Sequence, residues 1–348
     1  MTETPQKPDQ KAARVIGKPT LKTISKLSGL AIPTVSRALS DAPDISDKTK
    51  EKIREIAAEI GYVPNRAGVR LRTGKTLVIS LILAPDSELM PHTAQLITSI
   101  AQTLRETPYH LNVTPYLPDD DPMKPIRQIV ENRLADAVIL NRTQADDPRV
   151  AYLLDKKFPF ATHGRTNMSE RHAYFDYDNT AFGNFAVRHL AEKGRKSIVL
   201  LAPMRNQVYA THMIQGTLEA VTNIGSTLTV LDGVNSDEKI EDIRKAIARH
   251  LRLNPECDGL ICGSGVAAMA AAVGAADAGR NIGVDFDIFS KEATSILRFC
   301  HPNILTIRED VSEAGKFLAN AVVSALSDPD AAPKQGLQVP SEADLNFA

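Results

Sequence analysis

Short apolar runs alternate with longer amphipathic stretches from Leu77 onward. Apolar runs of four to seven residues predict buried strands, and apolar residues spaced three and four positions apart predict helices. The predicted strands are Leu77–Leu83, Leu111–Leu117, Ala137–Leu140, Phe158–Thr162, Ser197–Leu201, Leu228–Leu231, Gly259–Cys262 and Phe286–Ser290. The predicted helices between them include Thr93–Glu106, Thr180–Lys193, Tyr209–Asn223, Ile240–Leu251 and Ala267–Ala278.

This alternation is typical of an α/β fold built around parallel sheets. One doubly wound domain seldom needs so many units, so we expect two Rossmann-like lobes over residues 76–330, with the chain crossing between them near Asp176 and near Ile307. Ligands of such folds bind at the carboxyl ends of strands, in the cleft between lobes. The chain after Leu326 is rich in Asp, Pro and Ala, and this composition predicts a mostly irregular return segment over residues 331–348.

The pattern before the first predicted strand differs, because residues 19–63 contain three short helical repeats. Thr20 is placed to cap the first helix, Gly29 permits a tight turn, and Ser46 is placed to cap the third. In the second helix Val35 and Leu39 fall on the core side. This arrangement is typical of a helix-turn-helix DNA-binding head, although a small helical bundle without DNA function has the same pattern. The groove-facing candidates are Ile32, Pro33, Thr34, Ser36 and Arg37.

Residues 64–75 form a basic segment rich in small residues, with Leu71 placed among arginines. An apolar wedge flanked by Arg suits insertion into the minor groove of DNA. We therefore interpret this segment as a DNA-binding hinge and include Asn65 and Arg66 among its contacts.

Charge is distributed unevenly along the chain. The net charge is -1, yet residues 1–75 hold 15 Lys and Arg against 8 Asp and Glu, which gives +7 and leaves -8 for the rest. A basic head attracts phosphate while the acidic body repels it. Residues 1–18 are polar, without an apolar signal segment, so we expect a disordered extension and a cytoplasmic protein without membrane contact.

Three stretches together resemble the signature of the LacI/GalR family of bacterial repressors: Thr20–Ile24, Thr34–Leu39 and Gly61–Arg66. The resemblance covers nearly the entire chain. It implies that the second helix enters the major groove, that the hinges of two subunits pair in the central minor groove, and that Leu71 kinks the duplex. A homodimeric repressor on a pseudo-palindromic operator is therefore expected, and an activator of the same fold is the alternative.

The recognition helix departs from the family pattern at two positions. Ala31 stands where the family usually caps the helix with Ser, and Pro33 occupies a main base-reading position without a side-chain donor or acceptor. Proline is tolerated in the first helical turn. Hydrogen-bonded base readout should therefore depend on Arg37, with Thr20 and Ser40 as further contacts.

The resemblance further implies a body like a type I periplasmic sugar-binding protein, with an effector between its lobes. Met213 stands where many members place an Arg that binds hydroxyls or a carboxylate, so the cleft loses a fixed positive charge. His212 or Lys291 replaces that charge, or both are surface side chains. Glu292 retains two acceptors for hydroxyl groups, so we expect a sugar or polyol rather than a phosphate. The effector-site candidates are Asn141, His163, His212, Met213, Ser264, Lys291 and Glu292.

Other motifs favour different functions less well. Gly263–Ala268 fits G-x-G-x-x-A, which alone would indicate a nicotinamide-dependent oxidoreductase, but such a fingerprint normally begins its domain. The three cysteines, Cys257, Cys262 and Cys300, form no CxxC pair, so we predict buried thiols. The eight histidines form no HExxH motif, so we expect no metal site, no cofactor and no enzymatic activity. A sugar-transport binding protein would require a signal peptide and no DNA head.

Overall fold

The computed structural model describes residues 18–63, 68, 70, 73–83, 90–116 and 120–346. The chain divides after Lys75 into two compact units, a head and a body. Within the described ranges, no helix is both long and apolar enough to cross a lipid bilayer.

Residues 18–63 of the head form three helices around one small core: α1 (Leu21–Ser28), α2 (Ile32–Leu39) and α3 (Asp47–Glu59). Ile24, Val35, Ala38, Ile53 and Ala57 form that core. The predicted caps are confirmed, because Thr20 accepts a hydrogen bond from Thr23 N and Ser46 accepts one from Thr49 N. Gly29 has φ 74°, a left-handed conformation that the turn between α1 and α2 requires.

The first lobe of the body is a parallel six-stranded sheet in the order β11-β5-β4-β3-β1-β2. Its strands are β1 (Val78–Leu83), β2 (His110–Pro115), β3 (Ala137–Leu140), β4 (Phe160–His163), β5 (Ala173–Tyr177) and β11 (Gln335–Gln338). Its helices are α5 (Met90–Leu104), α6 (Met123–Glu131), α7 (Pro148–Asp155) and α13 (Val311–Ser327), with the short 3-10 helix η1 (Ser169–Arg171) before β5.

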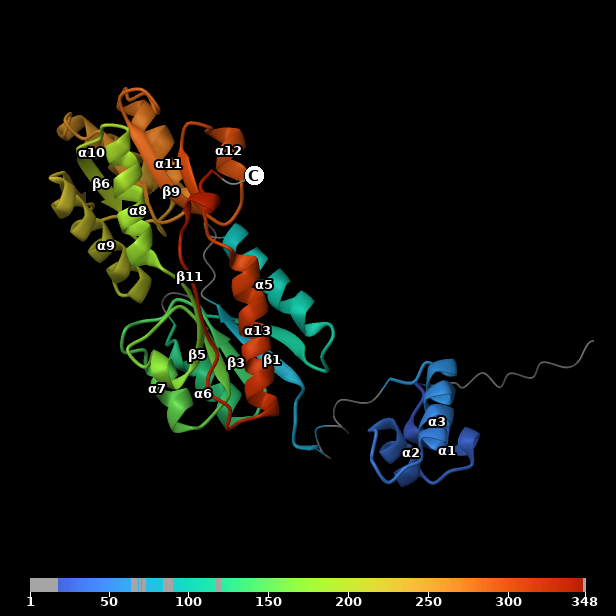
Figure 1. The fold of residues 1–348 in the computed structure, drawn as a ribbon. Coiled ribbons are helices and arrows are strands. Elements are labelled where there is room, and N and C mark those ends of the chain that lie inside the picture. Colours follow the sequence, from blue (N-terminus) through green and yellow to red (C-terminus); the bar gives the residue numbers. More distant parts are fainter. Residues whose placement is uncertain are drawn as a thin grey trace, which may run out of the picture. The chain divides into compact units, whose positions relative to one another are not determined.

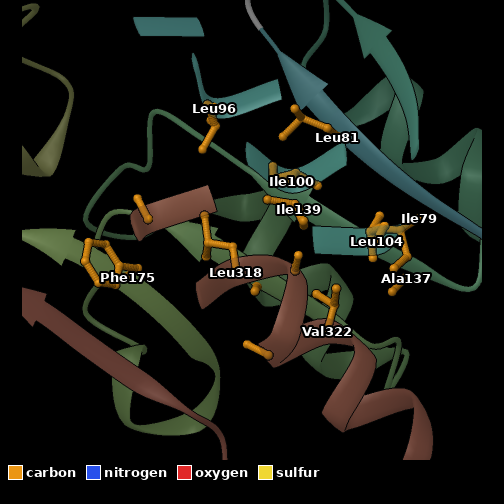
Figure 2. Close-up of a cluster of buried hydrophobic side chains, with 14 of the residues drawn as sticks. Ile79, Leu81, Leu96, Ile100, Leu104, Ala137, Ile139, Phe175, Leu318 and Val322 are labelled. Carbon is orange, nitrogen blue, oxygen red and sulfur yellow. The ribbon is translucent and has the colours of Figure 1, made fainter. Parts of the chain in front are cut away.

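Helices cover both faces of this sheet. Alternate residues of a strand point to opposite faces, so Leu81 of β1 packs with α5 and α13 while its neighbour Ile82 packs with α6 and α7. Figure 2 shows the first of these cores, in which Leu96 and Ile100 of α5 approach Leu318 of α13. Burial on both faces explains why the central strands β1 and β3 are nearly continuous apolar runs.

The second lobe repeats this architecture with five parallel strands in the order β10-β9-β8-β6-β7. Helices α8 and α9 pack with one face and α10 and α11 with the other (Figure 1). The strands are β6 (Ser197–Leu201), β7 (Thr227–Val230), β8 (Gly259–Cys262), β9 (Asp287–Glu292) and β10 (Leu305–Arg308). The helices are α8 (Asn179–Glu192), α9 (Val208–Ile224), α10 (Ile240–Leu253), α11 (Gly265–Asp277) and α12 (Ile296–Cys300).

The chain crosses between the lobes three times. It crosses from β5 to α8 and returns from β10 to α13, as the sequence predicts. The third crossing was not predicted. After β11 in the first lobe the chain forms the 3-10 helix η2 (Glu342–Asp344), and Leu345 then bridges Ile307 of the second lobe. A mostly irregular return segment was therefore an incomplete prediction, because β11 pairs in parallel with β5.

The predictions also missed β5 and β10 as strands. Asp176 interrupts the apolar run of β5, Thr306 and Arg308 interrupt that of β10, and Gln335 and Gln338 stand at the two ends of β11, so an apolar-run criterion passes over all three strands. The predicted burial of all three thiols is wrong for Cys300, which is exposed at the end of α12, whereas Cys257 and Cys262 are buried.

Candidate functional site

Helix α2 presents one continuous face to solvent. Ile32, Pro33 and Arg37 are exposed, Thr34 and Ser36 are half-buried, and Ser40 is exposed at the C-terminal end, where its hydroxyl donates to Ser36 O. The predicted division of the helix into a core side and an outer side is thus reproduced, with Ala38 joining Val35 in the core and Leu39 partly buried. Ala31 makes no side-chain cap, and Pro33 lies in the first turn, where proline costs no helical hydrogen bond.

Arg37 forms an ion pair with Asp44, which the sequence did not predict. Both side chains are exposed, with 57% and 46% of their side-chain surface accessible. Exposed pairs contribute little stability, so exchange of Asp44 for another acceptor would cost Arg37 little.

Part of the predicted hinge is described. Gly68, Arg70 and Thr73 are helical, and Gly74 N donates to Arg70 O at 2.8 Å. Asn65, Arg66 and Leu71 lie outside the described residues.

The body contains a cavity of about 160 Å³ lined by residues of both lobes. It lies at the carboxyl ends of the parallel strands, where the sequence predicts the ligand. Five predicted residues line it: Asn141 after β3, His163 at the end of β4, Ser264 after β8, and Lys291 and Glu292 at the end of β9.

Two predicted residues do not line the cavity. Met213 belongs to the buried face of α9, which packs in the core of the second lobe. The ligand-binding role that many family members give to an Arg at this place therefore does not apply to Met213. His212 is half-buried, and burial followed by the charge of Arg165 lowers the pKa of its ring. Tyr209, on the same helix, lines the cavity instead.

Lys291 is buried rather than on the surface. Its Nζ lies 3.1 Å from Glu309 Oε2 and donates to Asn179 Oδ1 at 3.0 Å. It also lies over the rings of Tyr177 and Tyr209, at 5.2 and 5.4 Å from their centroids. The predicted replacement cation is therefore present, but its charge is already paired.

Glu292 and Asn141 each leave a buried acceptor in the cavity wall. Leu297 N donates to Glu292 Oε1 at 3.0 Å, whereas Glu292 Oε2 has no hydrogen-bond partner among the residues that the structure describes. Asn141 Oδ1 likewise has none. Burial raises the pKa of Glu292, against the opposing effect of its backbone hydrogen bonds. Buried acceptors without partners are costly, so both atoms favour a ligand that donates hydrogen bonds.

Several cavity residues were missed by the sequence predictions. Glu309 follows β10, and the strand-end criterion would have found it had β10 been predicted as a strand. The other missed residues include His92 near the start of α5 and Asn179 at the start of α8.

Two ion pairs and a backbone hydrogen bond surround this site. Arg142 Nη2 in the first lobe lies 3.6 Å from Asp237 Oδ2 in the second, and Val208 N of α9 donates to Thr143 O across the lobes at 3.1 Å. Asp176 accepts from Arg165 Nε at 2.6 Å. Burial raises the pKa of Asp176, although Arg165 opposes the shift.

The G-x-G-x-x-A stretch has packing roles in this fold. Ser264 caps α11 by accepting from Ala267 N at 3.3 Å. A Cβ on Gly263 would lie 2.9 Å from Pro203 Cγ, and one on Gly265 would lie 3.0 Å from Glu292 Cγ. Both glycines therefore allow close approach within the second lobe.

Known proteins resemble the chain along nearly its whole length. Residues 20–65 match the family model for bacterial regulatory proteins of the lacI family, and residues 76–305 match that for periplasmic binding proteins and the sugar binding domain of the LacI family. The HTH-type transcriptional regulator AglR of Rhizobium meliloti is 28% identical over 327 residues, covering 91% of this chain and 90% of that protein. RafR of Escherichia coli is 33% identical over 207 residues, covering 59% and 61%.

Solved structures share the fold. A complex of the transcriptional regulator CelR with cellobiose has a TM-score of 0.68 at 21% identity and covers 93% of this chain and 98% of that chain. The lac repressor dimer bound to operator and the anti-inducer ONPF has a TM-score of 0.79 at 18% identity and covers 93% and 97%. With its helix-turn-helix head and two-lobed body, the chain belongs to the LacI family and is a DNA-binding transcriptional regulator.

Proposed function

We propose that this regulator is a homodimeric repressor whose affinity for a pseudo-palindromic operator is controlled by a sugar or polyol bound between its lobes. The observation that carries the ligand class is the pair of unpartnered buried acceptors, Asn141 Oδ1 and Glu292 Oε2, in the cavity wall. Hydroxyl groups donate hydrogen bonds to such atoms without adding charge. The sugar-binding description of the matched family and the cellobiose bound in the CelR complex support the same class.

The charges of the cavity favour hydroxyls over acidic groups. Its two lining cations, Lys291 and Arg142, lie beside Glu309 and Asp237 respectively. A sugar phosphate or sugar acid would have to break one of these buried pairs, which costs several kcal/mol. A neutral polyhydroxylated ligand leaves both intact.

The dimer follows from the geometry of operator reading. One small recognition helix reads few base pairs, so two symmetric heads are expected to read two half-sites. Ligand binding is proposed to change the relation of the two lobes, and with it the spacing of the two hinge segments on DNA. An activator would use the same coupling with the opposite effect on transcription.

A thermal-shift screen of sugars, polyols and sugar acids tests the ligand class, because a ligand that binds the folded protein raises its Tm. Hits should be neutral sugars or polyols, and they should change operator affinity measured by fluorescence anisotropy. Glu292→Gln, which retains one acceptor, should weaken binding about tenfold or more. The matched control is Glu342→Gln, whose carboxylate pairs with Arg188 and His189 outside the cavity lining. Binding restricted to acidic sugars would contradict the proposal.

A further inference from the structure

Two histidines and a glutamate meet on one side of the cavity. His92 comes from α5 and His163 from β4, both in the first lobe, while Glu309 follows β10 at the second crossing. One nitrogen of each ring and one carboxylate oxygen of Glu309 lie within 4.8 Å of one another. His92 Nε2 lies 3.8 Å from Glu309 Oε1, and the two rings are stacked with centroids 5.5 Å apart. We propose that His92, His163 and Glu309 form a binding site for a divalent transition-metal ion, with Zn²⁺ as the best chemical match.

The donor set fits this class of ion. Zn²⁺ binds imidazole nitrogen and carboxylate oxygen, and three protein ligands with an open fourth position are a recurring arrangement. Imidazole disfavours Mg²⁺ and Ca²⁺, which take oxygen ligands. A tetrahedral zinc ion holds its donor atoms about 3.4 Å apart. All three side chains keep some accessible surface, and side-chain rotation would bring their donor atoms from within 4.8 Å of one another to this spacing.

Glu309 divides its two oxygens between two roles. Oε2 lies 3.1 Å from Lys291 Nζ, which is itself held by Asn179, while Oε1 faces His92. An outer partner of this kind orients a metal-binding carboxylate.

The charge of the lining also favours a cation. Arg142 and Lys291 oppose four carboxylates, those of Asp176, Asp237, Glu292 and Glu309, which leaves a formal charge of -2 when the histidines are left out of the sum. Arg165, which pairs with Asp176 from outside the lining, reduces this only to -1. A divalent ion would offset the excess. Its open position would face the cavity, and it would link α5 and β4 of the first lobe to the β10–α13 crossing.

Titration of the full-length protein with Co²⁺, after removal of bound metal by a chelator, tests the site without DNA or sugar. We expect one Co²⁺ per chain, visible d–d absorption typical of four-coordinate cobalt, and displacement by Zn²⁺. His92→Gln and His163→Asn should each weaken Co²⁺ binding at least 100-fold while keeping the circular dichroism spectrum of the folded protein. His189→Gln is the matched control, because His189 pairs with Glu342 in the body at 3.3 Å but does not line the cavity; its Co²⁺ affinity should be unchanged.

Absence of stoichiometric Co²⁺ binding in the unsubstituted protein would overturn the site, as would full affinity in both cavity variants. Equal loss in His189→Gln would do so too, because it would indicate dispersed surface binding. None of these outcomes touches the proposed regulation by a sugar or polyol, which is measured separately by thermal shift and operator binding.

Discussion

The recognition helix and the cavity are assembled over different sequence distances. The candidate DNA-contact residues of α2 and its cap lie between Ile32 and Ser40, whereas the residues lining the cavity run from Pro91 to Glu309. Helical periodicity alone sorts the first set into an inner and an outer face. The second set depends on which strands end at the same edge and on where the chain crosses between lobes. Local rules therefore predict the head well and the cavity only in part.

The two regions also hold their cations differently. Arg37 pairs with Asp44 at the surface, where both groups remain hydrated. Lys291 pairs with Glu309 in a buried setting and is further bound by Asn179. A surface pair exchanges partners at little cost, whereas separating a buried pair leaves an uncompensated charge. The Arg37–Asp44 pair is thus suited to an exchange of partner, whereas the Lys291–Glu309 pair is suited to be kept.

The largest expected effect is the loss of operator binding when the head is removed. Deleting residues 1–75 should remove specific operator binding, a loss of about 10³-fold or more, since the remaining chain lacks α2. Fluorescence anisotropy with operator and scrambled DNA measures this loss. Calorimetry with a ligand from the thermal-shift screen should give an unchanged Kd. A truncated body that folds but no longer binds that ligand would contradict the separation of roles.

Arg37→Ala should cost about 1 to 3 kcal/mol of discrimination at one base pair in each half-site, because Arg37 is the residue of α2 able to contact guanine through two hydrogen bonds. Selection of binding sites from random DNA measures the change. Arg54→Ala is a matched control, since Arg54 pairs with Asp41 at 2.9 Å from α3 and is similarly exposed. If Arg37→Ala and the unsubstituted protein select identical sequences, Arg37 does not contact a base.

Gly216→Ala should destabilise the body by about 2 to 3 kcal/mol, because its Cβ would overlap the Thr180 carbonyl where α9 packs on α8. Chemical unfolding of the body alone, residues 76–348, measures the free energy of unfolding. The control is Ala220→Gly, which lies on α9 like Gly216 and should cost only about 1 kcal/mol. Gly279→Ala would not serve as a control, because Gly279 has φ 77°. Equal stability of Gly216→Ala and the unsubstituted body would mean that α8 and α9 can separate freely.

The smallest expected effect is a pH dependence of the body's stability. His172 is only 3% exposed, and burial lowers the pKa of its ring in the folded state. The unfolded chain therefore binds more protons than the folded one below the ordinary pKa of about 6.5. The contribution of neutral His172 to the free energy of unfolding is complete above a pH of about 6.5 and declines as the pH falls through that value. Urea unfolding at pH 7.5 and pH 5.5 should give a lower free energy of unfolding at pH 5.5, and His172→Asn should reduce the difference. A pH-independent free energy would contradict this.

Sequence patterns predicted most of the fold but not all of its topology. Eight strands, the helices between them and two of the three lobe crossings follow from apolar periodicity, which is clearest in strands buried on both faces, such as β1 and β3. The edge strand β11 escaped prediction, since Gln335 and Gln338 need no apolar face there. Of the seven predicted effector-site residues, five line the cavity, and four of these, Asn141, His163, Ser264 and Glu292, came from the strand-end rule. Met213 failed because a helix position is assigned to core or cleft by packing, not by spacing.

The sequence by itself determined the helix-turn-helix head, its caps and outer face, and the two-lobed α/β body, because each depends on interactions within a turn, a helix or a strand. Only the tertiary structure decided that Lys291 is buried against Glu309, that Arg37 is paired with Asp44, and that His92, His163 and Glu309 share one corner of the cavity. Those three side chains span more than two hundred residues of sequence, with no motif connecting them. Their meeting depends on the order of the strands and the return of the chain across the lobes, which no local pattern encodes.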